Sequence, residues 1–111
     1  MGQFVVGDVV VTKFPFSNLS ITKRRPALVL SEAEFGDLIL CQITSKSYSS
    51  QTAIPLEASN FEAGGLPISS YIRPDKLFTA EPTIIENTSG KLQVAKLDEV
   101  LTGVRSLFSG T

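Results

Sequence analysis

The chain has 111 residues, of which 42% are hydrophobic and 19% charged, and its formal net charge is −1. These values are typical of one ordinary globular domain, expected over residues 1–111. The near-neutral charge excludes a protein that coats nucleic acid through bulk electrostatics, although a local basic patch remains compatible with it. One cysteine and no histidine exclude an internal disulfide and argue against a structural zinc site.

No apolar run approaches the roughly 18 residues that a membrane span needs. Residues 1–6 also lack the cationic start and the long apolar segment of a signal peptide. A single cysteine inside an apolar run fits a reducing compartment. We therefore expect a cytoplasmic protein that has no membrane partner.

Three strands are predicted in the first half of the chain from β-branched and aromatic runs that end at turn signals. In chain order they cover 9–14, 26–31 and 38–44, and they are joined by a polar loop over 17–22 and a turn over 32–37. Gly7-Asp8 precedes the first strand, and Pro15 ends it. The basic run Lys23-Arg24-Arg25 stands directly before the second strand.

The second and third strands form a predicted hairpin whose register follows from side-chain alternation. Each strand has one apolar face, so a slip of one residue would place an apolar set beside a mixed one. A symmetric turn over 32–37 then predicts three facing pairs: Leu28 with Cys41, Leu30 with Ile39, and Arg25 with Thr44. The last pair should project from the face away from the core, at the open end of the hairpin.

The second half of the chain begins with more strand and turn signals and ends with a helical one. In order we predict a loop or lid over 45–51, a short edge strand over 53–56, a turn region over 60–67, a strand over 69–75 with Pro74 at an edge or strand end, a short strand over 83–85 and a turn over 87–90. Apolar residues then recur with helical spacing over 94–108, at Leu97, Val100, Leu101, Val104, Leu107 and Phe108. The whole pattern predicts a small, mostly β barrel or half-barrel closed by one C-terminal helix.

Three groups of residues are candidates for chemistry. Lys23-Arg24-Arg25 is either a solvated run of charges at a strand start, which protects against aggregation, or a phosphate-binding patch that uses the planar guanidinium group of arginine. Taken alone, the run favours the first interpretation. The hydroxyls of Thr44-Ser45 either bond nearby backbone or, opposite Arg25, contact an anion or a ribose. Arg73 and Asp75 share a strand face as a surface ion pair or as a base and a phosphate clamp.

Other candidates are weaker. Without histidine there is no serine or cysteine nucleophile with its usual base. Cys41 falls on the core face and should be inert, and Gly64-Gly65 lacks the spacing of a phosphate-binding loop. Tyr71 and Phe16 could stack nucleic-acid bases, although isolated aromatic residues more often belong to a core or its rim.

Several of these segments together resemble the MazF/PemK-like toxins of type II toxin–antitoxin systems, over nearly the whole chain. The most specific are Gly7-Asp8-Val9-Val10 and Arg24-Arg25-Pro26-Ala27-Leu28-Val29-Leu30-Ser31. The supporting ones are Phe14-Pro15-Phe16, Gln42-Ile43-Thr44-Ser45, Ser70-Tyr71-Ile72-Arg73-Pro74-Asp75-Lys76-Leu77 with Thr79, and Gly90-Lys91-Leu92 before the helix.

The resemblance implies a barrel of about five to seven antiparallel strands with a terminal helix, assembled as a homodimer. It implies a growth inhibitor that is a metal-independent endoribonuclease, needs no cofactor and cuts single-stranded RNA at short sequences. It also implies a cognate antitoxin, which lays an acidic extended segment across the RNA site and binds DNA together with the toxin. The family's catalytic residues correspond to Arg25, Thr44, Arg73 and Asp75. The neighbouring residues Lys23, Arg24, Ser45, Lys46 and Tyr71 are then expected to contact RNA.

This assignment suits RNA cleavage because RNA supplies its own nucleophile, the 2′-hydroxyl. Asp75 is the expected base. Arg25 and Arg73 are expected to stabilise the phosphate, and one of the two arginines could also act as the acid. Thr44 is expected to hold the scissile phosphate. The loop over 17–23 has no glutamate or histidine, unlike that of some family members. Two alternatives stay open: an inactivated member that acts as a binding module, and a gyrase-poisoning toxin on the same fold.

Overall fold

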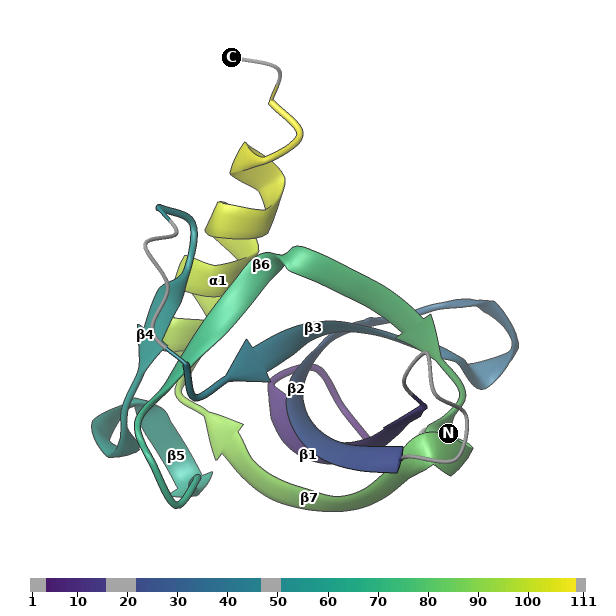
Figure 1. The fold of residues 1–111 in the computed structure, drawn as a ribbon. Coiled ribbons are helices and arrows are strands. Elements are labelled where there is room, and N and C mark those ends of the chain that lie inside the picture. The colour runs from purple at the N-terminus through teal and green to yellow at the C-terminus, as the bar shows by residue number, and fades with distance from the viewer. Residues whose placement is uncertain (1–3, 16–21, 47–50, 110–111) are drawn as a thin grey trace.

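A computed structural model describes residues 4–15, 22–46 and 51–109. It contains one seven-stranded antiparallel sheet, three short 3-10 turns and one α-helix (Figure 1). The strands and the helix are β1 (Asp8–Pro15), β2 (Thr22–Glu32), β3 (Leu38–Thr44), β4 (Ile54–Leu56), β5 (Phe61–Gly64), β6 (Ser70–Ala80), β7 (Ile85–Leu92) and α1 (Val94–Ser106). The predicted mostly β fold with a C-terminal helix is confirmed.

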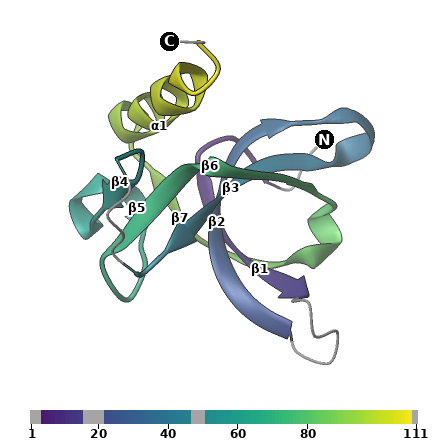
Figure 2. The same ribbon diagram turned by 45° about the horizontal axis from the view of Figure 1, so that its top comes forward.

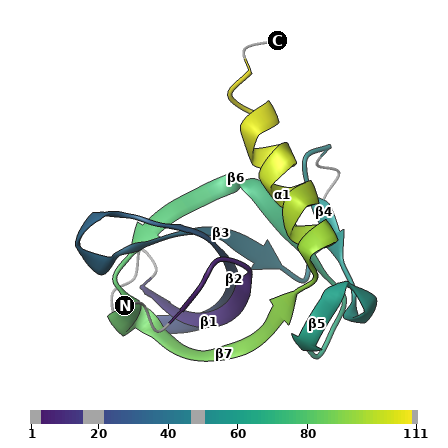
Figure 3. The same cartoon turned by 180° about the vertical axis from the view of Figure 1, so that it is seen from behind.

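The strands are hydrogen-bonded in the order β4-β6-β3-β2-β1-β7-β5, so the central strands are β3, β2 and β1. The sheet curls into a half-barrel, with β6 and β7 approaching each other through the turn at Pro82–Ile84 (Figure 1). Seen from behind, α1 crosses β6 at one end of the curl and lies beside β4 (Figure 3). In the described residues, no helix has the length and apolar character needed to cross a membrane.

Two separate apolar clusters bury both faces of the central strands. The cluster on the α1 side includes Leu28, Cys41, Ile43 and Ile72, and Val100 of α1 is part of it. The cluster on the opposite face consists of Phe4, Val10, Ala27, Val29, Leu38 and Leu40. The expectation of one core face and one open face on the β2–β3 hairpin is therefore wrong along most of its length. The curl of the sheet encloses the second face as well, because strongly twisted strands wrap around their own side chains.

The predicted register of the β2–β3 hairpin is confirmed in its central part only. Leu28 pairs with Cys41, as expected, but a bulge follows, and Ile39 pairs with Ser31 instead of Leu30. The cause lies in the turn, where Phe35 and Gly36 both adopt positive φ angles of 61° and 82°. An asymmetric turn of this kind adds a residue to one strand, which a bulge absorbs.

Strand β6 is longer than predicted and lies inside the sheet, between β4 and β3. Pro74 lies beyond the part of β6 that pairs with β4, since that ladder ends at Ile72, so the predicted edge position fits this side of β6. The pairing of β6 with β3 jumps from Ile72–Ile43 to Leu77–Cys41, so the segment around Pro74 bulges out of the ladder. A proline, which has no backbone N–H to donate, is tolerated within this strand because the bulge requires no hydrogen bond from it.

Two predicted turns are strands in the structure. The region over 60–67 contains β5, and the turn predicted over 87–90 lies inside β7. The short strand predicted over 83–85 is wrong for its first two residues, which belong to the 3-10 turn Pro82–Ile84. Glycine and asparagine suggested turns there, but Gly64 and Gly90 are paired across β5 and β7 at a point of close approach. A Cβ atom on Gly90 would lie 2.7 Å from the carbonyl oxygen of Ala63, so glycine serves packing at that position.

The C-terminal helix begins where predicted and ends two residues early. Leu97, Leu101 and Val104 pack against the apolar cluster around Val100, which confirms the stripe over these turns. Leu107 and Phe108 lie beyond the helix and are exposed, so the last part of the predicted stripe is wrong. Helical spacing continues through these two positions, but the helix itself ends at Ser106.

Candidate functional site

Arg25 lies in the outer part of β2, before the point at which β2 begins to pair with β3. It faces Thr12 of β1, whose hydroxyl donates a hydrogen bond of 2.9 Å to the Arg25 carbonyl oxygen. By alternation, the Arg25 side chain projects on the same face as Ala27 and Val29, which is the face opposite α1. Its Nε atom is buried, so the guanidinium group begins below the surface rather than in free solvent.

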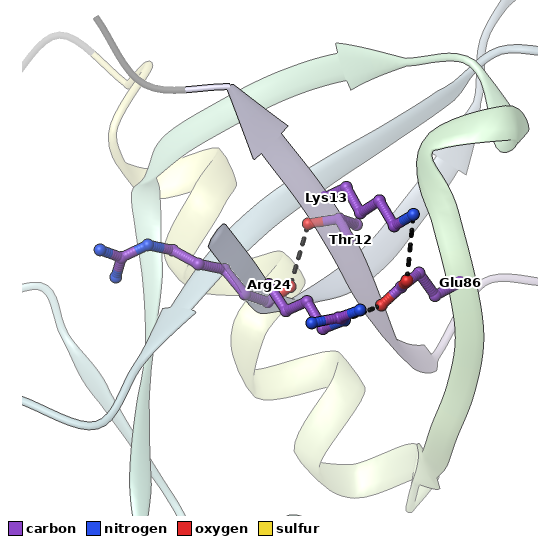
Figure 4. A network of polar contacts seen from close by, with 5 residues as sticks. Thr12, Lys13, Arg24 and Glu86 are labelled. Atoms are coloured by element: carbon purple, nitrogen blue, oxygen red, sulfur yellow. Dashed lines mark hydrogen bonds and ion pairs between the residues drawn. The ribbon is translucent and has the colours of Figure 1, made fainter. Parts of the chain in front are cut away.

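Arg24 projects to the other face of the sheet. It pairs with Lys13 across β1 and β2, and both cations reach Glu86 of β7 (Figure 4). The Lys13 Nζ atom is 3.3 Å from Glu86 Oε2, and the Arg24 Nε atom contacts Glu86 Oε1. Hydrogen bonding from Arg24 lowers the pKa of Glu86, which keeps this carboxylate ionised. The structure thus separates Arg24 from Arg25, although the two are adjacent in the basic run. Lys23 is exposed and shares the face of Arg25 by alternation.

Thr44 is the last residue of β3, and its side chain is buried. Its Oγ1 atom accepts a hydrogen bond of 3.2 Å from the backbone N–H of Lys46, which turns the chain away from the strand. Ser45 and Lys46 are exposed in this turn. Thr44 is paired with Tyr71 of β6, so these two side chains occupy the same face of the sheet.

The predicted facing pair of Arg25 and Thr44 is not among the observed pairs of β2 and β3, which end at Ala27–Gln42. Alternation places both side chains on the face that carries Val29 and Leu40. This agrees with the face predicted for the two residues. The ladder itself ends at Ala27, so the two strands diverge beside Arg25 and Thr44.

Arg73 and Asp75 form an ion pair on the exposed side of the β6 bulge. Arg73 Nη2 donates to Asp75 Oδ2 at 2.9 Å, and Arg73 Nε lies 3.4 Å from Oδ1. The hydrogen bond from Arg73 lowers the pKa of Asp75 below its ordinary value of 3.8. Pro74, between them, is buried on the α1 side. The predicted shared face of Tyr71, Arg73 and Asp75 is confirmed by this alternation.

One face of the half-barrel therefore carries five of the predicted site residues, namely Arg25, Thr44, Tyr71, Arg73 and Asp75. They come from three neighbouring strands, β2, β3 and β6, with Arg73 and Asp75 at the bulge within β6. Two guanidinium groups and one carboxylate on one face can bind a phosphate and accept a proton beside it. Across the described ranges, no three His, Cys, Asp or Glu side chains are grouped so that they could hold a metal ion.

The remaining predicted candidates are placed as follows. Cys41 is fully buried, and burial raises the pKa of its thiol to about 12, which makes it unreactive. Gly64-Gly65 lies at the end of β5, away from the strands of the candidate site. Phe16 lies outside the described residues, as does most of the loop over 17–22.

Two residues that the sequence did not single out contact the basic run, Thr12 and Glu86. Thr12 stands inside a β-branched run, and threonine is common in strands, so nothing in the sequence marks it as functional. Glu86 stands in a region read as strand and turn, and its partners are more than sixty residues away. Only the pairing of β1 with both β2 and β7 brings these residues to the basic run.

The sequence matches a family model described as a PemK-like, MazF-like toxin of a type II toxin–antitoxin system, over residues 6–108. Since this match covers nearly the whole chain, the chain belongs to that family. The resemblance inferred from its motifs is thereby confirmed. A comparison with curated protein sequences finds no match.

Solved structures of similar fold are also found. An endoribonuclease from a mycobacterial species, in complex with its cognate antitoxin, is 14% identical, with a TM-score of 0.76 over 97% of each chain. A chain of the MazE–MazF structure from Deinococcus radiodurans is 23% identical, with a TM-score of 0.75 over 96% of each chain. The Mycobacterium tuberculosis toxin MazF-mt6 is 17% identical, with a TM-score of 0.71 over 91% of this chain and 95% of that one. At these identities the likeness shows the fold.

Proposed function

We propose that this toxin is a metal-independent endoribonuclease that cleaves single-stranded RNA. The observation that supports this most is the common face of Arg25, Thr44, Arg73 and Asp75, which lie on three adjacent strands. Tyr71 on the same face offers an aromatic ring on which a base can stack. Several relatives of the same fold are named endoribonucleases, which is consistent with the proposal.

The proposed reaction uses the 2′-hydroxyl of the RNA as its nucleophile. The Asp75 carboxylate accepts the hydroxyl proton, the O2′–P bond forms, and the P–O5′ bond breaks to leave a 2′,3′-cyclic phosphate. The leaving 5′-oxygen takes up a proton from solvent water. Arg25 and Arg73 stabilise the charge that develops on the phosphate oxygens, and Thr44 holds the scissile phosphate in place. An arginine is a poor acid because of its very high pKa, so we assign both arginines an electrostatic role.

The ion pair between Arg73 and Asp75 bears directly on the base. A carboxylate held by a guanidinium group at 2.9 Å is a weak proton acceptor, as the lowered pKa of Asp75 indicates. A bound RNA phosphate competes for the same guanidinium group. Substrate binding would then loosen the ion pair and return Asp75 toward its ordinary basicity. This coupling would activate the base only when RNA is bound.

The proposed partners follow the family. The toxin would act in the cytoplasm as a homodimer, and a cognate antitoxin would cover the site face with an acidic, extended segment. The exposed cations Lys23 and Lys46 would steer either the RNA or this segment. Sedimentation of the purified protein at micromolar concentration tests the assembly, and a monomer under those conditions would contradict the homodimer.

The decisive experiment is incubation of the purified protein with single-stranded RNA of diverse sequence in the presence of EDTA. Discrete fragments with 2′,3′-cyclic phosphate ends are expected. Arg25→Ala should lose most of this cleavage. Arg105→Ala, which removes an exposed arginine of α1, is the matched control and should cleave normally. Intact RNA with every sequence would overturn the proposal and favour a binding module without catalytic activity.

A further inference from the structure

We propose that Thr12 and Glu86 are positioning residues that hold the end of β2 from its two faces, so that Arg25 is presented to RNA in one fixed direction. This inference rests on the proposed function, in which Arg25 stabilises the scissile phosphate. Neither residue touches the proposed substrate. Both act on the strand segment that carries the arginine.

The end of β2 needs such support because it is paired on one side only. Within the described ranges, β2 pairs with β1 from Thr22 to Leu28 but with β3 only from Ala27 onward. The segment that contains Arg25 therefore has an open side toward the candidate site. A strand end with one neighbour opens locally more readily than a central strand, since fewer hydrogen bonds resist its displacement.

Thr12 supports this segment from the site face. It is the cross-strand partner of Arg25, it is fully buried, and its hydroxyl donates to the Arg25 carbonyl oxygen at 2.9 Å. A buried hydroxyl must keep its partner, because an unsatisfied one costs about 1–3 kcal/mol. The hydrogen bond therefore ties the backbone of Arg25 itself to β1, and valine at this position would remove it with little change in shape.

Glu86 supports the same segment from the opposite face. It binds Arg24 of β2 and Lys13 of β1, which are themselves cross-strand partners (Figure 4). Three strands are thereby connected through one carboxylate. Because neighbouring side chains of a strand point to opposite faces, holding Arg24 on this face keeps Arg25 on the other. Exposed ion pairs contribute little to global stability, so their effect here is local.

Two measurements on four variants test the proposal. The first is amide hydrogen exchange of residues 23–25, which reports the opening of the strand end without any reference to activity. The second is RNA cleavage, with kcat and KM measured separately. The variants are Thr12→Val, Thr12→Ser, Glu86→Gln and Glu99→Gln. Thr12→Ser keeps the hydroxyl, and Glu99→Gln removes a comparable ion pair with Lys96 on α1, away from the site.

We expect Thr12→Val to accelerate exchange at residues 23–25 and to lower kcat by about tenfold, since small displacements of an orienting group are costly. KM and binding of a 2′-O-methyl RNA copy should change less than about twofold, because the phosphate-binding charges remain. Thr12→Ser should restore both values. Glu86→Gln should behave like Thr12→Val at low salt, and its difference from wild type should shrink at high salt, because screening weakens the ion pairs of the wild type. Glu99→Gln should match wild type.

Unchanged exchange in both Thr12→Val and Glu86→Gln would overturn the proposal. So would faster exchange with wild-type kcat, because the strand end would then be held for stability alone. If the wild-type protein leaves all RNA intact, the proposed function fails and the catalytic role of the two residues fails with it. The exchange rates would still decide in that case whether Thr12 and Glu86 hold the strand end.

Discussion

Arg73 and Asp75 form a two-point ion pair across the β6 bulge, with Nη2–Oδ2 and Nε–Oδ1 distances of 2.9 and 3.4 Å. The geometry depends on Pro74 between them, which is buried toward α1 and leaves its two neighbours on the opposite face. The bulge also separates this segment from the ladder of β3, so that the side chains meet each other instead of cross-strand partners. The result is a pre-formed pair of opposite charges on the site face.

The first prediction concerns the pH dependence of this ion pair. The folded state lowers the pKa of Asp75 below 3.8, so the stabilisation is present above that pH and is lost as the pH falls through the folded value. Wild type should therefore be more stable than Asp75→Asn at neutral pH, by less than about 1 kcal/mol because the pair is partly exposed. Urea unfolding of both proteins from pH 7 to pH 3 should show the difference shrinking. A difference that is independent of pH would contradict the assignment.

The second prediction concerns Cys41. Burial raises the pKa of its thiol from 9.0 to about 12, so the folded protein should resist a thiol reagent at pH 8 and react fully in denaturant. Above pH 9 the Cys41 thiol keeps its proton in the folded state and loses it in the unfolded state. The free energy of unfolding should therefore fall between pH 9 and pH 12 relative to Cys41→Ala, measured as a difference between the two proteins. Labelling of native protein at pH 8 would show that the strand opens.

The third prediction compares two glycines with positive φ angles. Gly64 has a φ angle of 66°, and a Cβ atom there would lie 2.3 Å from the Ser89 carbonyl oxygen. Gly36 has a φ angle of 82° with open space around it. Gly36→Ala should cost about 1 kcal/mol from backbone strain alone. Gly64→Ala should cost ~2–4 kcal/mol, since it adds a clash with the backbone of β7. Equal losses in chemical denaturation would show that β5 moves away from β7 to accommodate the methyl group.

The fourth prediction concerns Phe35, at the tip of the β2–β3 hairpin, which projects beyond the rest of the sheet (Figure 2). Phe35 is 96% exposed and has a φ angle of 61°, a strained conformation for a bulky side chain. Asparagine tolerates this conformation better, so Phe35→Asn should stabilise the protein by ~1 kcal/mol. Thermal unfolding measures the effect. A loss of stability, or a change in sedimentation, would show instead that Phe35 is buried against another molecule in solution.

Local patterns were sufficient to predict β3, the central part of β2 and most of the helix. The second strand was predicted over 26–31 but is Thr22–Glu32 in the structure, so the basic run lies inside it. The third strand was predicted with its observed bounds, 38–44, because most of its residues are apolar and it lies between clear turn signals. Leu97, Val100 and Val104 identified the buried stripe of α1 for a similar reason. In these segments the apolar positions of the sequence are the positions that the fold buries, so local and tertiary preferences coincide.

Glycine and proline were read less accurately, because their local preferences were overruled by packing. Gly90 and Pro74 suggested a turn and a strand end, yet both lie inside long strands. At Gly90 the close approach of β5 excludes any side chain, and at Pro74 a bulge removes the need for a backbone donor. Such reasons depend on which strands become neighbours, and that is a property of the whole sheet.

For the candidate site, strand alternation was enough to predict which chemical groups share a face. It separated Arg25 from Arg24, and it grouped Tyr71, Arg73 and Asp75. Three further relationships follow from the folded sheet alone: β2, β3 and β6 lie side by side, Asp75 is bound to Arg73, and Thr12 and Glu86 flank the end of β2. The physical reason is that a strand's period is local, whereas its neighbours are chosen by the burial of two apolar clusters shared among distant segments.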